Sequence, residues 1–228
     1  MRSGLLSAFA VVAAAAVTAG CGGNAKSSQP TSAPTVSLWV SGTAKDYRQV
    51  AAGVKLALAE RGGRAGVFRV NYAGRQVSDD AARATADAVV NARTSLQDTQ
   101  ASAVITDAGP AAARPAITLL NEAGISAVAL GDTALKREAC SAASDIYPAA
   151  HQTAIVVPEG PAPTAAWAAR FRRQLGFAPT DAAWRAYQGA QSVLAAIGAP
   201  GVATGASTPR LDRDALAAKL VRAHGDCT

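Results

Sequence analysis

The sequence of 228 residues has few of the side chains that metal sites and nucleic-acid surfaces require. It has three cysteines and two histidines, and His151 and His224 are too far apart for the spacing of zinc ligands, so we expect no metal site. The net charge is +6, but no run of Lys and Arg is longer than Arg172-Arg173. Because nucleic-acid binding needs a clustered basic patch, we expect a surface rich in arginine and no nucleic-acid partner.

The motifs of common enzyme classes are absent as well. No Gly-x-Gly-x-x-Gly run follows the first predicted strand, no Gly-x-x-x-x-Gly-Lys phosphate loop occurs, and there is no Gly-x-Ser-x-Gly elbow. We therefore expect no cofactor and no enzymatic activity. Asp145, His151 and a nearby serine could form a catalytic triad, but such combinations arise by chance in a chain rich in Ser and Asp.

Small apolar side chains dominate what is present. Half of the chain is hydrophobic, alanine makes up roughly a quarter of it, which is well above ordinary usage, and aromatic residues reach only 5%. The interior is therefore expected to consist of small side chains on closely packed helices. Trp39, Trp167 and Trp184 are predicted core residues. Trp39 is also close to the carboxyl end of the first predicted strand, where alternation would point it into a helix layer.

The first 20 residues have the layout of a secretory signal. Arg2 gives a positive start, residues 4–20 carry no charge, and Val17-Thr18-Ala19-Gly20 precedes Cys21. This segment resembles a bacterial lipoprotein signal, which implies lipid on Cys21 and anchoring to the outer face of the cell membrane. A transmembrane anchor and ordinary secretion with Cys21 as a plain thiol are the alternatives. Residues 21–34 are rich in Gly, Ser, Thr and Pro and are predicted to form a flexible tether.

Two cysteines, Cys140 and Cys227, remain if Cys21 carries lipid. An exported compartment permits disulfides, and two remaining cysteines in such a protein are more often bonded than free. We predict a disulfide between them, which would connect the C-terminal tail to the middle of the chain. Two unpaired thiols are the alternative.

Strand and helix signals alternate through the rest of the chain. Apolar runs rich in β-branched residues predict strands, and helical spacing with capping residues predicts the helices between them. The predicted strands are residues 35–40, 67–72, 101–106, 125–130 and 153–157, with a turn at 41–43. The predicted helices are residues 46–61, 81–96, 110–122, 164–175, 180–197 and 212–223, and residues 198–209 are expected to be a loop. This order predicts an α/β fold, with an open, mostly parallel sheet covered by helices on both faces in three layers.

An ordered set of short motifs extends over most of this predicted domain. The set comprises Ser41-Gly42, Tyr47, Gly53, Ala57-Leu58-Ala59-Glu60, Ser78-Asp79-Asp80, Ala103-Val104-Ile105, Glu122-Ala123-Gly124-Ile125-Ser126, Asp132-Thr133, Phe171 to Gly176, Pro179-Thr180 and Ala186-Tyr187-Gln188-Gly189-Ala190. It resembles the type I periplasmic binding proteins, in particular the leucine/isoleucine/valine-binding family of ABC transporter substrate-binding lipoproteins. The resemblance implies one α/β domain over residues 35–228. In it, residues 35–135 are similar to the family's first lobe, 136–160 are a shortened remnant of the second lobe, and 161–228 supply the C-terminal helices.

Ligands of open parallel sheets bind beyond the carboxyl ends of the strands. The residues at these ends predict the ligand site, which comprises Ser41, Asp107, Ala108, Gly109, Asp132 and Thr133. The resemblance implies that the turn before the third helix, together with Thr133, holds the α-amino and α-carboxylate groups of an amino acid.

The turn before the third helix departs from the family pattern. Pro110, Ala111 and Ala112 stand where serines are usual, and Pro110 also removes one backbone donor, so a carboxylate is expected to bind less well here. Asp107 could pair with an ammonium group instead, or it could cap the following turn.

Functions of different classes follow from these observations. The first is a membrane-anchored solute-binding lipoprotein that presents a small polar ligand, such as an amino acid, to an ABC permease. The alternative is a degenerate one-lobe domain that acts as an interaction or scaffold lipoprotein, whose open face binds a protein or a second copy. A hydrolase is the third, and loss of activity on substitution of a serine or histidine would have to support it.

Overall fold

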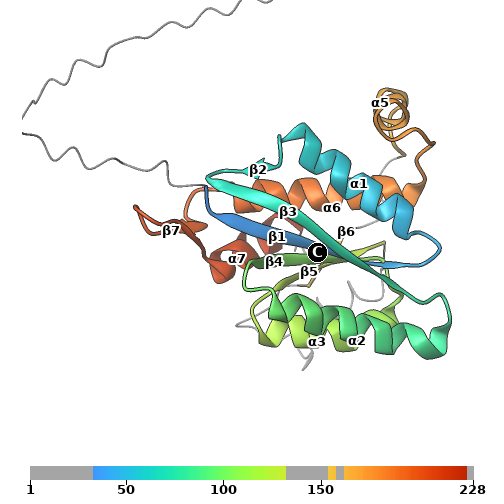
Figure 1. Cartoon of the computed structure of the whole chain (residues 1–228), viewed down its shortest axis with the longest axis horizontal. Helices are drawn as coiled ribbons and strands as arrows, with labels where there is room; N and C mark the ends of the chain where they lie inside the picture. The colour runs from blue at the N-terminus through green and yellow to red at the C-terminus, as the bar shows by residue number, and fades with distance from the viewer. Residues whose placement is uncertain (1–32, 132–153, 158–161, 225–228) are drawn as a thin grey trace, which may run out of the picture. The chain divides into compact units, whose positions relative to one another are not determined.

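The computed structural model describes residues 33–131, 154–157 and 162–224 (Figure 1). The strands are β1 (Thr35–Thr43), β2 (Arg64–Ala65), β3 (Phe68–Val77), β4 (Ala101–Thr106), β5 (Ser126–Leu130), β6 (Ala154–Val157), β7 (Ala203–Thr204) and β8 (Arg210–Leu211). The helices are α1 (Tyr47–Glu60), α2 (Ala81–Gln97), α3 (Pro110–Glu122), α5 (Ala165–Leu175), α6 (Asp181–Ile197) and α7 (Arg213–His224). All of them belong to one compact unit, Ala33–Thr228, which contains its own apolar core.

Six strands form one sheet in the order β2-β3-β1-β4-β5-β6. The strands from β3 to β6 run parallel to their neighbours, and only the short β2 is antiparallel to β3. The sheet and its covering helices confirm the predicted α/β class. The chain passes from β1 to β3 on one side and then returns to β4 on the other side, so the direction of winding changes between β1 and β4. In open α/β sheets, this switch point is where a crevice forms outside the carboxyl ends of the strands.

Helices cover both faces of the sheet (Figure 1). α1 and α6 lie on one face, where α7 also contacts β5 and β6, and α2 and α3 lie on the other face. The contact between α1 and α6 is very close, because a Cβ added at Gly53 of α1 would lie 2.1 Å from the Ala183 carbonyl oxygen of α6. Ala183, Ala186 and Ala190 are fully buried in α6. These contacts confirm that small side chains on closely packed helices build the interior.

The tryptophans occupy two different layers. Trp167 of α5 is 3% exposed and packs on α1 and α6, with its ring centroid 5.2 Å from that of Phe171 and 4.7 Å from that of the half-buried Trp184. Trp39 points into the α2–α3 layer, as strand alternation predicted, and its indole N–H donates to Asp98 Oδ2 at 2.9 Å.

Several helix ends follow the local signals in the sequence. Gly62 and Gly63 end α1 with φ values of 60° and 66°, which favour glycine. The Asp80 side chain caps α2 by accepting a hydrogen bond from the Ala82 N–H at 2.8 Å. Pro110 occupies the first turn of α3, where its missing N–H has no helical partner to lose.

The predicted turn at residues 41–43 is wrong, because β1 continues through Thr43. The residues from Ser41 to Thr43 pair with those from Arg75 to Val77, and this pairing also extends β3 beyond its predicted end. The sequence analysis likewise missed β2 and the β7–β8 hairpin, of which β7 lies within the predicted loop 198–209. Polar and glycine-containing segments became strands here because a neighbouring strand supplies their backbone partners.

Other predictions fall outside the described residues. They are the signal over residues 1–20, most of the tether, lipid on Cys21, ligand contacts of Asp132 and Thr133, a disulfide between Cys140 and Cys227, most of the shortened remnant at 136–160, and the imagined set of Asp145 and His151. Over residues 33–131, 154–157 and 162–224, no helix is long and apolar enough to cross a membrane, and no cluster of His, Cys, Asp and Glu could hold a metal ion.

Candidate functional site

A pocket of about 590 Å³ lies at the switch point, outside the carboxyl ends of β1 and β4. We call it the strand-end pocket. It is built from the end of β1, the segments that begin α1 and α2, and the turn between β4 and α3. Its lining comprises Thr43, Lys45, Asp46, Ser78, Asp79, Ala81, Ala84, Thr85, Asp107, Gly109, Pro110, Ala111 and Ala112.

Asp107 connects the two strands that flank the switch point. The Thr43 N–H donates to Asp107 Oδ1 at 2.6 Å, and Thr43 Oγ1 donates to Oδ2 at 3.1 Å. Burial raises the pKa of Asp107, although the hydrogen bonds from Thr43 act in the opposite direction, and the nearby charge of Asp46 raises the pKa further. The carboxyl group of Asp107 therefore holds β1 against β4 at the floor of the pocket, while α3 begins at Gly109 without a side-chain cap.

Two predicted site residues lie beneath the pocket and do not line it. Ser41 is buried on the α2 side of β1, where its Oγ accepts a hydrogen bond from Asn91 Nδ2 at 3.1 Å. Ala108 is 4% exposed, and its N–H donates to Thr106 Oγ1 at 3.2 Å. Among the predicted residues that the structure describes, Asp107 and Gly109 line the pocket.

Asp46 and Asp79, which precede α1 and α2, line the pocket but are not among the predicted site residues. Asp46 is the N-cap residue of α1, but its carboxylate makes no capping hydrogen bond. Asp79 Oδ1 accepts a hydrogen bond from the Lys45 N–H at 3.0 Å, which joins the two segments. An acidic residue just before a helix is the signal that could have identified both, because the start of a helix favours negative charge.

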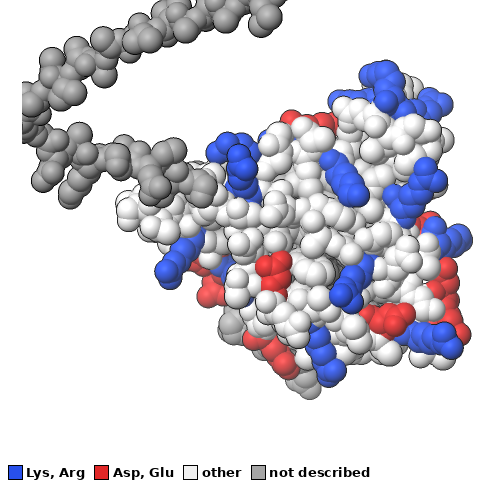
Figure 2. Space-filling model, in the orientation of Figure 1, with Lys and Arg blue, Asp and Glu red and all other residues white. Residues whose placement is uncertain are grey.

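The lining has an acidic balance. It contains three carboxyl groups, those of Asp46, Asp79 and Asp107, and one lysine, Lys45. On the face shown in Figure 2, acidic and basic side chains are interspersed, including at the right-hand edge of the view. Small apolar residues, including Ala81, Ala84 and Ala111, complete the walls. The arrangement suits a small solute with an ammonium group and a short apolar part.

The pocket lies where open, doubly wound α/β sheets bind ligands. No protein-family model matches the chain, and no curated protein matches its sequence. Solved structures do match it in fold. An ABC transporter substrate-binding protein from Desulfitobacterium hafniense, in complex with Leu, has 11% sequence identity and a TM-score of 0.56, with 82% of this chain and 87% of that chain covered.

A second solved structure gives the same result. The branched-chain amino acid transporter substrate binding protein of Streptococcus pneumoniae, in complex with isoleucine, has 12% identity and a TM-score of 0.56, with 82% of this chain and 88% of that chain covered. At these identities, the comparison establishes the fold. The chain has the fold of the type I periplasmic binding proteins, as the sequence resemblance predicted.

Proposed function

We propose that the protein is a solute-binding lipoprotein, anchored to the outer face of the cell membrane through lipid on Cys21, that presents a small polar ligand to an ABC permease. The strand-end pocket at the β1–β4 switch point is the observation that carries this proposal. Its volume of about 590 Å³ lies in the range of small-molecule sites. The fold shared with amino acid-binding transport proteins supports the same function.

The charges of the pocket favour a ligand with an ammonium group, such as an amino acid or an amine. Asp46 and Asp79 lie on the segments that begin α1 and α2, and each presents carboxylate oxygens that no side chain in the described residues neutralises. Asp107 is already bonded to Thr43 and would act mainly by holding the floor of the pocket in place. A ligand carboxylate would meet the start of α3, where Pro110 offers no N–H.

Ligand-induced stabilisation tests this proposal. Residues 33–228 are screened by thermal shift against three sets of compounds: L-amino acids, the corresponding amines without the α-carboxylate, and the corresponding carboxylic acids without the α-amino group. A ligand at a hundred times its Kd stabilises the fold by about 2.7 kcal/mol. Asp46→Asn should abolish most of the shift, because it removes a carboxylate from the lining, whereas Glu122→Gln, at the far end of α3, should leave the shift unchanged. Absence of stabilisation by any of these compounds at millimolar concentration would contradict the proposal.

One observation favours a second candidate, a one-lobe interaction or scaffold lipoprotein. The large sheet of the described residues and the helices that cover it build a single lobe, whereas periplasmic binding proteins close two lobes around a ligand. In this alternative, the face at the strand ends would bind a protein partner or a second copy. Analytical sedimentation separates the two candidates: a ligand-binding monomer supports the first, and a self-associating chain without ligand affinity supports the second.

A further inference from the structure

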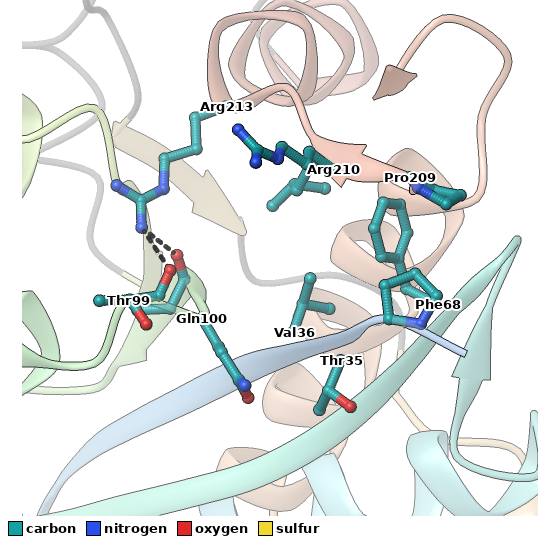
Figure 3. A pocket seen from close by; sticks show the side chains of 11 residues that line it. Thr35, Val36, Phe68, Thr99, Gln100, Pro209, Arg210 and Arg213 are labelled. Carbon is teal, nitrogen blue, oxygen red and sulfur yellow. Dashed lines mark hydrogen bonds between the residues drawn. The ribbon is translucent and has the colours of Figure 1, made fainter. Parts of the chain in front are cut away.

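A second pocket lies at the opposite end of the sheet, where the parallel strands begin (Figure 3). We call it the strand-start pocket. Its volume is about 500 Å³, and it is formed by the starts of β1, β3 and β4 together with β8 and the first residue of α7. Its lining comprises Pro34, Thr35, Val36, Phe68, Thr99, Gln100, Ala101, Pro209, Arg210, Leu211 and Arg213. It shares no residue with the strand-end pocket.

Arg213 is a fixed cation at this pocket. Its guanidinium donates to three backbone carbonyl oxygens, those of Ala101 at 3.0 Å, Thr99 at 3.4 Å and Ala123 at 3.5 Å. Carbonyl oxygens are neutral acceptors, so they hold the group in place without cancelling its charge. The side chain is half-buried at the edge of the sheet.

Arg210 brings a second positive charge to the same place. Its side chain extends toward Arg213 in Figure 3, and within the described residues its guanidinium has no hydrogen bond or ion pair. The lining contains no Asp or Glu. Of the nearest carboxylates, Asp98 accepts hydrogen bonds from Trp39 Nε1 and the Gln100 N–H, and it also interacts with the charge of Arg213, which lowers the pKa of Asp98. Asp212 caps α7 by accepting a hydrogen bond from the Ala215 N–H. Arg210 therefore brings to the pocket a positive charge that no carboxylate of the described residues pairs with, and such a charge favours an anion.

Most of the remaining lining is apolar. Val36 and Phe68 are 4% and 1% exposed and belong to the core between the sheet and α1, and Pro34, Pro209 and Leu211 form the rim. Thr35, Thr99 and Gln100 add polar side chains to the lining, and of these Thr99 lies beside Arg213 (Figure 3). The planar guanidinium of arginine matches phosphate oxygens in a bidentate geometry. This combination fits a phosphate ester attached to an apolar group.

The short distance in sequence between the pocket and Cys21 indicates where such an ester would come from. Pro34 lines the strand-start pocket, and twelve residues separate it from Cys21. If these residues form the tether that the sequence predicts, a flexible segment of this length has a root-mean-square span of roughly 20 Å and cannot exceed about 45 Å. If Cys21 carries lipid, as the proposed function holds, the pocket is confined close to a phospholipid surface. We propose that the strand-start pocket binds the phosphate of an anionic phospholipid headgroup.

Vesicle binding of residues 33–228 tests the proposal without the lipid anchor. The unit should co-sediment with phosphatidylcholine vesicles that contain phosphatidylglycerol and not with phosphatidylcholine alone. Arg210→Gln should weaken this binding about tenfold, as expected for loss of a charge-assisted hydrogen bond. The Arg210 side chain is exposed and has no hydrogen bond or ion pair in the described residues, and its β7–β8 contacts are made by the backbone, so the fold should be unaffected. Arg83→Gln, which removes the same charge from an exposed position on α2, should bind like the unaltered chain.

Three results would overturn the proposal. Equal binding to both kinds of vesicle would exclude recognition of the anionic headgroup. An equal loss in Arg83→Gln would show attraction by the overall positive charge instead of a site. Binding of glycerol phosphate as tight as binding of the vesicles, measured by titration calorimetry, would assign the pocket to a free phosphate ester and remove the lipid as its source. Arg210→Gln should leave ligand-induced stabilisation at the strand-end pocket unchanged, so that failure here is distinguishable from failure of the proposed function.

Discussion

Substitution of Gly53 by alanine is the sharpest test of how α1 and α6 pack. A Cβ at this position would lie 2.1 Å from the Ala183 carbonyl oxygen and 3.0 Å from the Tyr187 backbone nitrogen. Both atoms belong to the backbone of α6 and cannot rotate away, so the helices would have to separate by more than about 1 Å. Overpacking costs about 1–3 kcal/mol, and a backbone obstacle places this site at the upper end of that range.

Helix propensity opposes this steric cost. Alanine is about 1 kcal/mol better than glycine inside a helix. We therefore expect Gly53→Ala to lower the free energy of unfolding by about 2 kcal/mol, which corresponds to a fall in Tm of roughly 4–8 °C for a domain of this size. Urea unfolding followed by far-UV circular dichroism measures the change.

Ala59→Gly supplies the matched control, because Ala59 is an exposed position of the same helix. It should lose up to about 1 kcal/mol from propensity alone. If Gly53→Ala were instead as stable as the unaltered protein, or more stable by the propensity gain, the close α1–α6 contact and the packing argument built on it would be refuted.

Two further predictions concern the carboxyl groups of Asp107 and Asp98, both of which are partly exposed. Burial raises the pKa of Asp107, so the pKa of this carboxyl group is higher in the folded than in the unfolded protein. The contribution of Asp107 to the free energy of unfolding is therefore fully present below the unfolded pKa and is lost as the pH rises through the folded pKa. Asp107→Asn should therefore flatten the decline of Tm with rising pH above the usual Asp range, and an unchanged Tm–pH curve would contradict this. Trp39→Phe removes the 2.9 Å hydrogen bond to Asp98, one of the bonds that, against the effect of desolvation, lower the pKa of that carboxyl group. This substitution should lower the free energy of unfolding by about 1–2 kcal/mol at neutral pH, and by less as the pH falls through the folded pKa of Asp98. A decrease that does not depend on pH would show that the substitution removed only packing contacts.

The location of the candidate site could be predicted from the sequence, but only some of its lining residues could. The rule that ligands bind beyond strand carboxyl ends led to the β4–α3 turn, and Asp107 and Gly109 do line the strand-end pocket. Ser41 does not, because β1 continues past it and its side chain is directed to Asn91 under α2. Asp46 has the local signal of an acidic residue before a helix, but its place in the pocket depends on α1 and the β4–α3 turn meeting at the switch point, which only the tertiary structure shows.

Local chemistry in the sequence determined most elements of this protein. Apolar periodicity, glycines after helices, Asp80 as a cap and Pro110 in a first turn act within a few residues of chain, so β4, α2, α3 and the helical ends could be predicted from them. Only the tertiary structure decided the strand order, the extension of β1 and β3 and both pockets. Each depends on contacts between distant segments, such as Thr43 with Asp107 or Arg213 with the carbonyl oxygen of Ala101, whose free energy exists only after the chain has closed the loops between them.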